Sequence, residues 1–566
     1  MSDNIIIIFL LYFIIIFATI GLGKFFLLIF YKDENYLNFG YVGLFSCLVL
    51  ILYSYLSNFF FPHGFIHNSI LILLGLILFI YFYLKSKINF INLKFIFLLF
   101  YFFILFISFL IFKTHEDFPY YHFPYTYYLT QNSLIIGLGN YDLGFRTPSS
   151  IFYLGSLFYL PLVKFYMFLM PAILFIGFAN LIFIDKIYED FRIKKINFLT
   201  YFSLLSFIFV NIFFYRIAAH GTDRSAQILV LVLILEILDF INYSSNFKKD
   251  IIKKIFKICI LIALIISLKA FYILYLIFLI ILLYYLFKKN TYKIFFQYLF
   301  LNKSMILLLL VILVVLIKNF LITGCFLYPV KFTCFENFSW SLTFKEVDRL
   351  YNHYQLWSKG GMAPNYITDD PVSYLKGFNW VKGWVNIYFF TKVTDFLSGV
   401  ILILIITNVI FYSNLKNKYK ENREILLVVF VLFLLFFEWF YNHPDLRYGG
   451  YCIIVGLIFT FFSIKLSSYQ TDIDKLYKKF IFLIILSLVI LVIRNYFRIL
   501  EEVKKYNYQP LQHSGFMFEE NHYFRASKYF NALIKNYKSC MLGDLNCEKN
   551  LRKKINYRYY KYILLK

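Results

Sequence analysis

Charged residues are scarce in this sequence, and acidic residues are the scarcer kind. Only 15% of the 566 residues are charged, with 31 Asp and Glu against 56 Lys and Arg. A soluble domain needs more polar surface than this, so the composition excludes a soluble fold. The net charge of +25 can indicate nucleic-acid binding. Here the lysines fall in short segments between apolar runs, as in cytoplasmic loops, so we expect no nucleic-acid partner.

Several catalytic signatures are also absent. The sequence contains no P-loop, dinucleotide-binding fingerprint, nucleophile elbow or zincin motif. Any energy source must therefore come with the substrate or from an ion gradient. The amino terminus has neither the basic segment nor the small-residue cleavage site of a secretory signal peptide, so it is predicted to be a first membrane helix.

Long apolar runs are what the sequence has in abundance. Hydrophobic residues make up 61% of the chain, and the mean hydropathy is +0.71. A membrane-spanning helix needs about 20 mainly apolar residues, and about fourteen runs meet this requirement. They lie near 4–30, 39–57, 68–84, 95–113, 166–185, 197–215, 225–241, 255–268, 270–287, 304–322, 396–413, 425–441, 449–464 and 480–497. We predict an all-α integral membrane protein with about 12–14 transmembrane helices.

The connections between these runs predict the orientation of the chain. Short basic connections mark the cytoplasmic side. Given the predicted spans, they all fall on one side of the membrane: 85–94, 185–195, 246–254, 288–293, 414–423 and 475–479. The opposite side then holds the outer segments 114–150, 216–224, 323–393 and 442–448, together with a turn at Lys269. We expect a polytopic domain over 1–497 and an extracytoplasmic tail over 498–566, in a bacterial inner membrane with the site facing the periplasm.

Four cysteines fall on the predicted outer side. Cys325 and Cys334 share one outer segment, and Cys540 and Cys547 share the tail. In an oxidising compartment each pair is predicted to form a disulfide, the alternative being four free thiols. Four of the five Trp residues also lie in segment 323–393. They are suited either to anchoring at the membrane interface or to stacking on sugar rings.

Acidic residues open the first outer segment. Glu116 and Asp117 follow a predicted span and so lie at the membrane surface. A carboxylate there is suited to act as a general base for a hydroxyl, or to bind a divalent metal ion with its neighbour. The alternative is a pair of solvated loop acids without a function.

Basic residues recur in the other outer segments. Arg216, Asp223 and Arg224 lie in or beside "HGTDRSAQ", where Thr222 or Asp223 could instead cap a helix starting near Ser225. The run 255–287 would make a single helix of roughly 50 Å, too long for a ~30 Å bilayer core, so Lys269 marks a turn between two helices.

Lys269 then either reaches the membrane surface or awaits a phosphate. Arg447, in "NHPDLRYGG", is suited to phosphate through its planar guanidinium. The spacing of the outer histidines matches no zinc site.

The stretch "EDFPYYHFPYTYYLTQNSLIIGLGN", followed by "GFRTPSSIFYLG", resembles an uncharacterised family of large bacterial membrane proteins. The residues that carry the resemblance are Asp117, Tyr121, His122, Gly139, Asn140, Arg146, Ser150 and Phe152. "HGTDRSAQIL", "SLKAFYILY", "GCFLYP" and "HPDLRYGG" are similar to further blocks of that family in the same order.

That family distantly resembles the membrane-embedded glycosyltransferases of the GT-C class. The resemblance implies a polyprenyl-phosphate-linked sugar as donor and transfer on the outer face. Asp117, with Glu116 beside it, would match the catalytic acid of the class, and Lys269 and Arg447 its phosphate-holding cations. His122, Arg146, Arg216, Asp223 and Arg224 complete the set of candidate substrate-binding residues. This chain differs from the class in having about three additional spans before the acidic segment.

These observations predict a glycosyltransferase that uses a polyprenyl-phosphate donor to modify a cell-envelope glycan or lipid, with a divalent metal ion as a candidate cofactor. A polysaccharide polymerase or ligase is one alternative, because it also acts on lipid-linked phosphate. A transporter or lipid flippase is the other, and it predicts essential charges within the spans.

Overall fold

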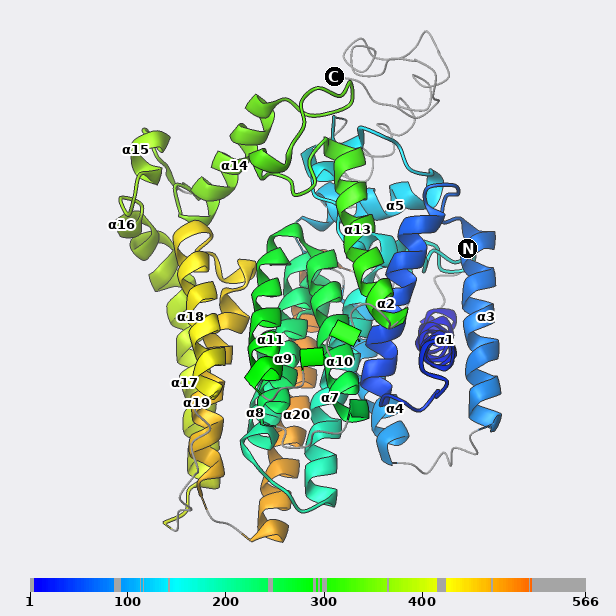
Figure 1. The fold of residues 1–566 in the computed structure, drawn as a ribbon, viewed down its shortest axis with the longest axis vertical. Coiled ribbons are helices and arrows are strands. Elements are labelled where there is room, and N and C mark those ends of the chain that lie inside the picture. The colour runs from blue at the N-terminus through cyan, green and yellow to red at the C-terminus, as the bar shows by residue number, and fades with distance from the viewer. Residues whose placement is uncertain are drawn as a thin grey trace.

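Long apolar helices packed side by side make up this fold (Figure 1). The computed structural model describes residues 5–85, 93–111, 113–115, 117–140, 143–242, 248–288, 292–293, 296–297, 303–363, 366–414, 424–469, 472–507 and 509–511.

The helices of the first half are α1 (Ile5–Tyr31), α2 (Phe39–Ser57), α3 (Phe65–Lys85), α4 (Leu93–Leu105), α5 (Phe123–Gln131), α6 (Ser150–Ser156), α7 (Met170–Arg192), α8 (Phe198–Phe213), α9 (Gly221–Ile241), α10 (Lys248–Leu268) and α11 (Ile277–Lys288). The second half contains α13 (Lys303–Thr323), α14 (Phe344–Ser358), α15 (Pro371–Leu375), α16 (Val381–Trp384), α17 (Thr394–Phe411), α18 (Ile425–Asn442), α19 (Gly450–Ser467) and α20 (Ile473–Tyr506). The strands β1 (Met362–Ala363) and β2 (Tyr366–Ile367) form a small antiparallel hairpin.

Within the described residues, eleven helices are long and apolar enough to cross a membrane. The predicted all-α polytopic membrane fold is confirmed. The helix α8 is apolar but shorter, and α9 and α10 carry charged residues within their length. Several of those charges pair between the two helices: Lys254 binds Asp239, and Lys257 Nζ lies 3.3 Å from Glu236 Oε1. Pairing allows α9 to lie buried among apolar helices despite its carboxylates.

The helix α1 crosses its neighbours steeply. Figure 1 looks almost along its axis, whereas α2 and α3 are seen from the side. Small residues allow the close approach at the crossing, because a Cβ on Gly21 would lie 2.2 Å from the carbonyl oxygen of Gly75. Small residues bring helix backbones together in membranes by the same means.

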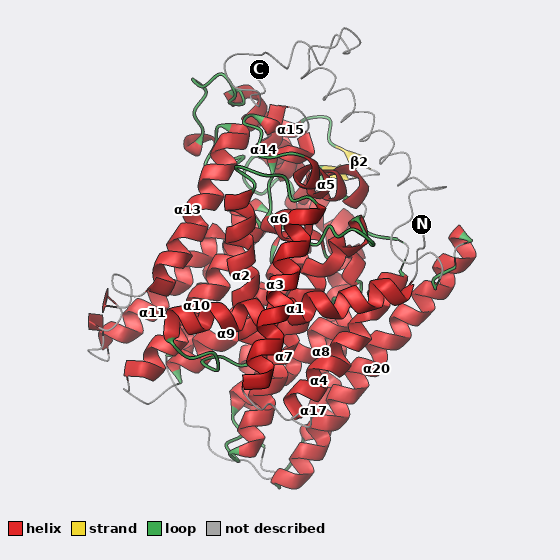
Figure 2. Cartoon of the chain, turned by 90° about the vertical axis from the view of Figure 1, so that its right-hand side faces the viewer, coloured by secondary structure: helices red, strands yellow, loops and turns green. Residues whose placement is uncertain are grey.

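The connections that were predicted to be outer segments gather at one end of the bundle. Figures 1 and 2 both show α5, α14 and α15 at this end, which we call the predicted outer face. Cys325 and Cys334 form a disulfide there, within a small apolar cluster that includes Tyr328 and Val347. Cys540 and Cys547 lie outside the described residues.

The last described helix runs past the predicted start of the tail. The helix α20 continues unbroken to Tyr506, so it includes the first residues of the segment 498–566 that was predicted to be the tail. With 34 residues it spans about 50 Å at 1.5 Å per residue, more than the ~30 Å bilayer core requires. Its final turns therefore reach the predicted outer face, where Glu502 accepts the N–H of Lys113, just before the first outer segment.

Candidate functional site

The first outer segment places Asp117 between two other parts of the chain. The backbone N–H of His115 donates to the carbonyl of Ala218 at 3.3 Å, and the N–H of Lys113 donates to Glu502 Oε2 at 3.0 Å. The N–H of Asp117 donates to His115 Nδ1 at 3.0 Å, and a short π-helix, Phe118–His122, then leads into α5. Glu116, the second predicted carboxylate, lies outside the described residues.

The first turn of α9 supplies a second carboxylate, Asp223. The helix begins at Gly221, so the expectation that Asp223 caps a helix starting near Ser225 is wrong. Asp223 lies inside the first turn, and its Oδ1 is 2.5 Å from Lys269 Nζ. Lys269 occupies the extended residue that follows α10, where Ser149 Oγ donates to the carbonyl of Leu268 at 2.6 Å.

Arg447 is held by a dense set of hydrogen bonds in the turn between α18 and α19. Asp445 Oδ1 accepts the N–H of Arg447 at 3.0 Å and the hydroxyl of Tyr388 at 2.6 Å. The side chain of Gln227, on α9, donates to the carbonyl of Arg447 at 2.9 Å. Trp384 Nε1 donates to the carbonyl of Pro444 at 2.8 Å.

These tryptophan contacts bear on the predicted roles of the Trp residues. Trp380 and Trp384 are buried, with 0% and 4% exposure, and pack against each other and Phe440. They support the turn that carries Arg447 and are closed to a sugar ring. Trp357 is 38% exposed and remains accessible.

Charged side chains from these segments meet in one group, which we call the carboxylate cluster: Asp117, Asp223, Asp445, Lys269 and Arg447. Arg447 Nη1 lies 3.8 Å from Asp117 Oδ2, and Arg447 Nε lies 3.6 Å from Asp445 Oδ2. Tyr448 joins the two cations, since its hydroxyl accepts from Arg447 Nη2 at 2.8 Å and its ring lies 4.5 Å from Lys269 Nζ. The cluster holds three carboxylates against two cations, so it carries a net negative charge.

Asp117 is the most accessible carboxylate of the cluster. Its side chain is 35% exposed, against 17% for Asp223 and 10% for Asp445. Its contacts with described side chains are all made by Oδ2, which faces Arg447, His115 and Tyr121. Oδ1 is therefore left for a group that enters from outside.

Electrostatics keep Asp223 ionised and the nearby histidines neutral. Burial raises the pKa of Asp223, but the charges of Lys269 and Arg447 outweigh it, so the net shift is downwards. Burial lowers the pKa of His115 and takes that of His122 well below its ordinary value. Because His115 Nδ1 already accepts the N–H of Asp117, any proton on the neutral ring is on Nε2.

Arg216 and Arg224 do not pair with the carboxylate cluster. Arg216 is exposed, and its Nε donates to the hydroxyl of Tyr215 at 2.7 Å. Arg224 makes no ion pair with the described residues, although its charge reaches His115. Tyr215, next to Arg216, contacts Asn495 and Arg494 of α20, and the charge of Arg498 on α20 acts on Arg224.

Arg146 and His122, two further predicted substrate-binding residues, make contacts outside the carboxylate cluster. Arg146 Nη2 lies 3.1 Å from Glu346 Oε1, and its Nε donates to the carbonyl of Gly139 at 2.9 Å. It thereby ties the first outer segment to α14. His122 lies next to the cluster with its ring stacked on His115, 5.7 Å between centroids, and its buried Nε2 has no hydrogen-bond partner among the described residues.

Arg498 is a basic residue near the site that was not predicted from the sequence. Arg498, on α20, donates through Nη2 to the carbonyl of Lys113 and through Nε to Glu502 Oε1 at 2.8 Å. A signal was available, because Arg494 and Arg498 are four residues apart and share a face of a largely apolar helix.

The candidate metal site of Glu116 and Asp117 lies only partly within the residues that the structure describes. No group of three His, Cys, Asp or Glu side chains among them is arranged to hold a metal ion. The guanidinium of Arg447, 3.8 Å from Asp117, already supplies positive charge at that carboxylate. The Glu116 half of the prediction falls outside the described residues.

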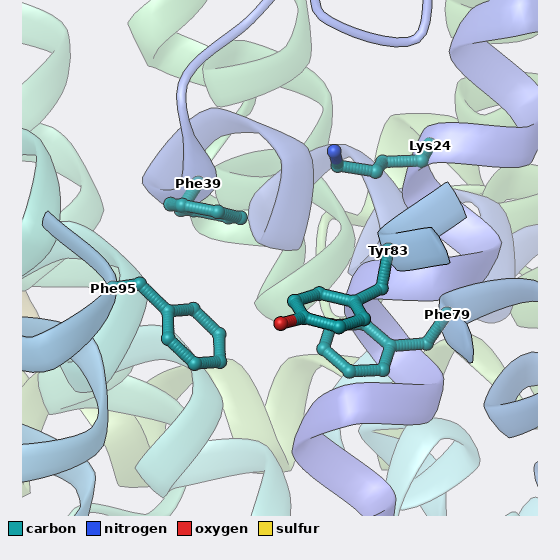
Figure 3. A pocket seen from close by; sticks show the side chains of 5 residues that line it. All are labelled: Lys24, Phe39, Phe79, Tyr83 and Phe95. Carbon is teal, nitrogen blue, oxygen red and sulfur yellow. The ribbon is translucent and has the colours of Figure 1, made fainter. Parts of the chain in front are cut away.

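A small aromatic pocket lies away from this cluster. Figure 3 shows its lining residues, Lys24, Phe39, Phe79, Tyr83 and Phe95, which surround a hollow between α1, α2, α3 and α4. Lys24 Nζ donates to Asn35 Oδ1 at 3.3 Å. Phe39, Tyr83 and Phe95 lie near the ends of α2, α3 and α4 that are remote from the predicted outer face, so the pocket is separate from the carboxylate cluster.

The apolar helices and the polar cluster at one end of them define a polytopic α-helical membrane protein with a charged site at its surface. The chain belongs to the family defined by the domain of unknown function DUF8201, which matches residues 5–454. No curated protein matches the chain, and no solved structure does. The match includes every residue of the carboxylate cluster and ends before α20.

Proposed function

We propose that this protein is a membrane glycosyltransferase of a bacterial inner membrane. It would move a sugar from a polyprenyl-phosphate donor to a cell-envelope glycan or lipid on the periplasmic face. The observation that carries the proposal is the meeting of Asp117 and Arg447, 330 positions apart in the sequence, at 3.8 Å. They lie at the end of the bundle where the long segment 323–393 supplies a surface for an acceptor.

In this proposal Asp117 is the general base. Its free Oδ1 takes the proton of an acceptor hydroxyl, and the hydroxyl oxygen forms a bond to the anomeric carbon of the sugar. The bond between that carbon and the phosphate oxygen breaks, and its electron pair leaves with the polyprenyl phosphate. Arg447, whose Nη1 lies 3.8 Å from Oδ2, stabilises the charged form of the carboxylate, and the hydrogen bond from the Asp117 N–H to His115 Nδ1 helps to hold the residue in place.

The leaving phosphate needs positive charge that neighbouring carboxylates do not already neutralise, because fixed cations lower the barrier where negative charge develops. Lys269 is paired with Asp223, and Arg447 lies between Asp117 and Asp445. Arg216 and Arg224 make no ion pair with the described carboxylates, so they are better placed to supply this charge.

The test is sugar transfer by purified protein in detergent or nanodiscs, with polyprenyl-phosphate sugars as donors and envelope lipid extract as acceptor. Replacing Asp117 by Asn should lower the rate of transfer by about 10²-fold or more, the usual range for a lost general base. Asp348→Asn is the matched control, because Asp348 lies on α14, 46% exposed, and pairs with Lys331 away from the cluster.

Full activity in Asp117→Asn would remove the assigned base. If the unaltered protein transferred no sugar from any such donor, the enzyme assignment itself would be wrong.

A transporter or lipid flippase is the second candidate, favoured by one buried cation. Lys318 lies within α13 and is 0% exposed. Its Nζ is 3.3 Å from Asn58 Oδ1 and 4.0 Å from the centre of the Phe59 ring, with no carboxylate against it among the described residues. Such a residue inside a span often marks a transport path. Movement of a substrate into sealed vesicles without a covalent product, lost in Lys318→Met, would support this function over transfer.

A further inference from the structure

Three arginines gather where α20 passes the first two outer segments. Arg498 binds the carbonyl of Lys113, just before the segment that carries Asp117. The guanidinium of Arg216 lies over the ring of Tyr215 and donates to its hydroxyl. Asn495, on α20, donates to the Tyr215 carbonyl at 3.2 Å. Arg224 lies close enough to Arg216 and Arg498 for their charges to act on it. We call Arg216, Arg224 and Arg498 the arginine cluster.

Two guanidinium groups of this cluster have donors that the described residues leave unused. Nη1 of Arg224 and Nη1 of Arg498 are both buried and have no hydrogen-bond partner among the described residues. Buried polar groups are nearly always hydrogen-bonded, so these two donors are available to an acceptor other than the described residues. Guanidinium groups bind phosphate in particular, because their planar N–H pairs match two phosphate oxygens.

The charge at this place also favours an anion. Arg494, one turn before Arg498, lies with its guanidinium 3.9 Å from the centre of the Tyr215 ring and donates to the carbonyl of Ile212. The carboxylate that pairs with the arginine cluster among the described residues is Glu502, at 2.8 Å from Arg498. Among the described residues, these four arginines are paired with this single carboxylate, which leaves an excess of positive charge.

The surface around the cluster indicates where the anion comes from. On the same stretch of α20, Ile493, Tyr496 and Phe497 are 46%, 55% and 58% exposed. Apolar side chains exposed on a membrane helix face lipid, and arginine near the helix end reaches the headgroup level. A phosphate carried on a lipid can therefore approach the arginines from the side, within the membrane.

We propose that Arg224 and Arg498, with Arg216 at the rim, form a binding site for the phosphate of a membrane lipid. The site adjoins the carboxylate cluster, because Asp223 belongs to that cluster and the next residue, Arg224, belongs to the arginine cluster. Within the proposed transferase this site receives the phosphate end of the donor, and to that extent it rests on the proposed function. Lipid binding itself requires no transfer, and it involves a helix outside the region that matches the family.

Direct binding of a defined lipid tests the site without any sugar present. The probe is polyprenyl monophosphate, added to the purified full chain in detergent and measured by native mass spectrometry or fluorescence quenching. Arg224→Gln and Arg498→Gln should each weaken binding about tenfold or more, the effect of losing charge-assisted hydrogen bonds. Arg224→Lys should restore only part of the loss, because lysine lacks the planar pair of donors.

Controls separate the site from general charge and from folding. Arg192→Gln is the matched control, since Arg192 is 63% exposed and pairs with Glu189 at the other end of the bundle. Unphosphorylated polyprenol should bind at least about tenfold more weakly than the monophosphate, because it makes none of the charge-assisted hydrogen bonds. If Arg224→Gln or Arg498→Gln fails to fold, Arg216→Gln, whose side chain is exposed, should still weaken binding measurably.

The proposal is overturned if the arginine variants bind the monophosphate as the unaltered protein does, or if polyprenol binds equally well. Competition by inorganic phosphate at the same affinity as the lipid would assign the site to free phosphate and overturn the lipid part. Asp117→Asn should bind the lipid normally. If the unaltered protein bound the lipid normally but transferred no sugar, only the transferase function would be rejected. If it transferred sugar and the arginine variants bound the lipid as well as it does, only this binding site would be rejected.

Discussion

Lys269 Nζ lies 2.5 Å from Asp223 Oδ1, in a contact that joins the residue after α10 to the first turn of α9. The two side chains are 30% and 17% exposed, so each charge is partly removed from water. The pair therefore removes the need for Lys269 to extend to the membrane surface. Lys269 was predicted either to reach the membrane surface or to await a phosphate, and in the structure its charge is paired with that of Asp223.

Breaking this pair should destabilise the protein in a non-additive way. Asp223→Asn or Lys269→Gln alone leaves an uncompensated charge and should lower the free energy of unfolding by about 1–2 kcal/mol, less than for a fully buried pair. The double variant should lose less than the sum of the two. Thermal denaturation of the four proteins in one detergent measures the coupling. Strictly additive losses would mean that the two groups do not interact in the folded protein.

Gly221 should tolerate no side chain. Its φ is +53°, and a Cβ there would lie 2.8 Å from Cε1 of His122. Gly221→Ala combines left-handed backbone strain of about 1–2 kcal/mol with this clash, so it should lower the midpoint of thermal unfolding clearly. Gly64→Ala is the matched control, because its Cβ would meet nothing within 4 Å. Equal midpoints for the two variants would show that the close packing of His122 on α9 does not exist.

Acid should destabilise the predicted outer face through its histidines. Desolvation lowers the pKa of His443 to about 4 and that of His220 to about 3, from an ordinary value of 6.5. The folded state thus favours the neutral rings. Their contribution is complete above pH ~6.5 and is lost as the pH falls from there towards the folded-state values, by up to about 1.4 kcal/mol per pH unit for each ring.

His443 offers a way to isolate one such contribution. Thermal unfolding of the protein and of His443→Gln should be compared at several values between pH 7 and pH 4. The variant should lose stability less steeply on acidification, because it has one ring fewer to protonate on unfolding. Parallel profiles would show that His443 titrates normally in the folded protein.

Much of the architecture could be predicted from local composition. Runs such as 39–57 and 425–441 are apolar over the length that a bilayer requires, and the helices α2 and α18 cover almost the same residues. The turn at Lys269 followed from length alone, and the structure ends α10 at Leu268. A span needs only its own side chains to satisfy the membrane, so a window of sequence contains the necessary information.

The pairing of charges could not be predicted in this way. Lys269 and Arg447 are as basic in the sequence as Arg224 and Arg498, and nothing local shows that the first two meet aspartates. That outcome depends on how α9, α10 and the turn after α18 are rotated against one another. A rotation of α9 by one residue, about 100°, would point Arg224 in the direction that Asp223 now has.

The sequence by itself determined the solvent of this protein, the positions of most of its helices and which polar segments are its candidates for chemistry. It did so because transfer of each segment into lipid depends on the side chains of that segment alone. Only the tertiary structure decided that Asp117 meets Arg447, that Lys269 is neutralised by Asp223, and that α20 brings Arg498 to Arg224. Those contacts join residues up to 330 positions apart, and their energies exist only once the helices have packed.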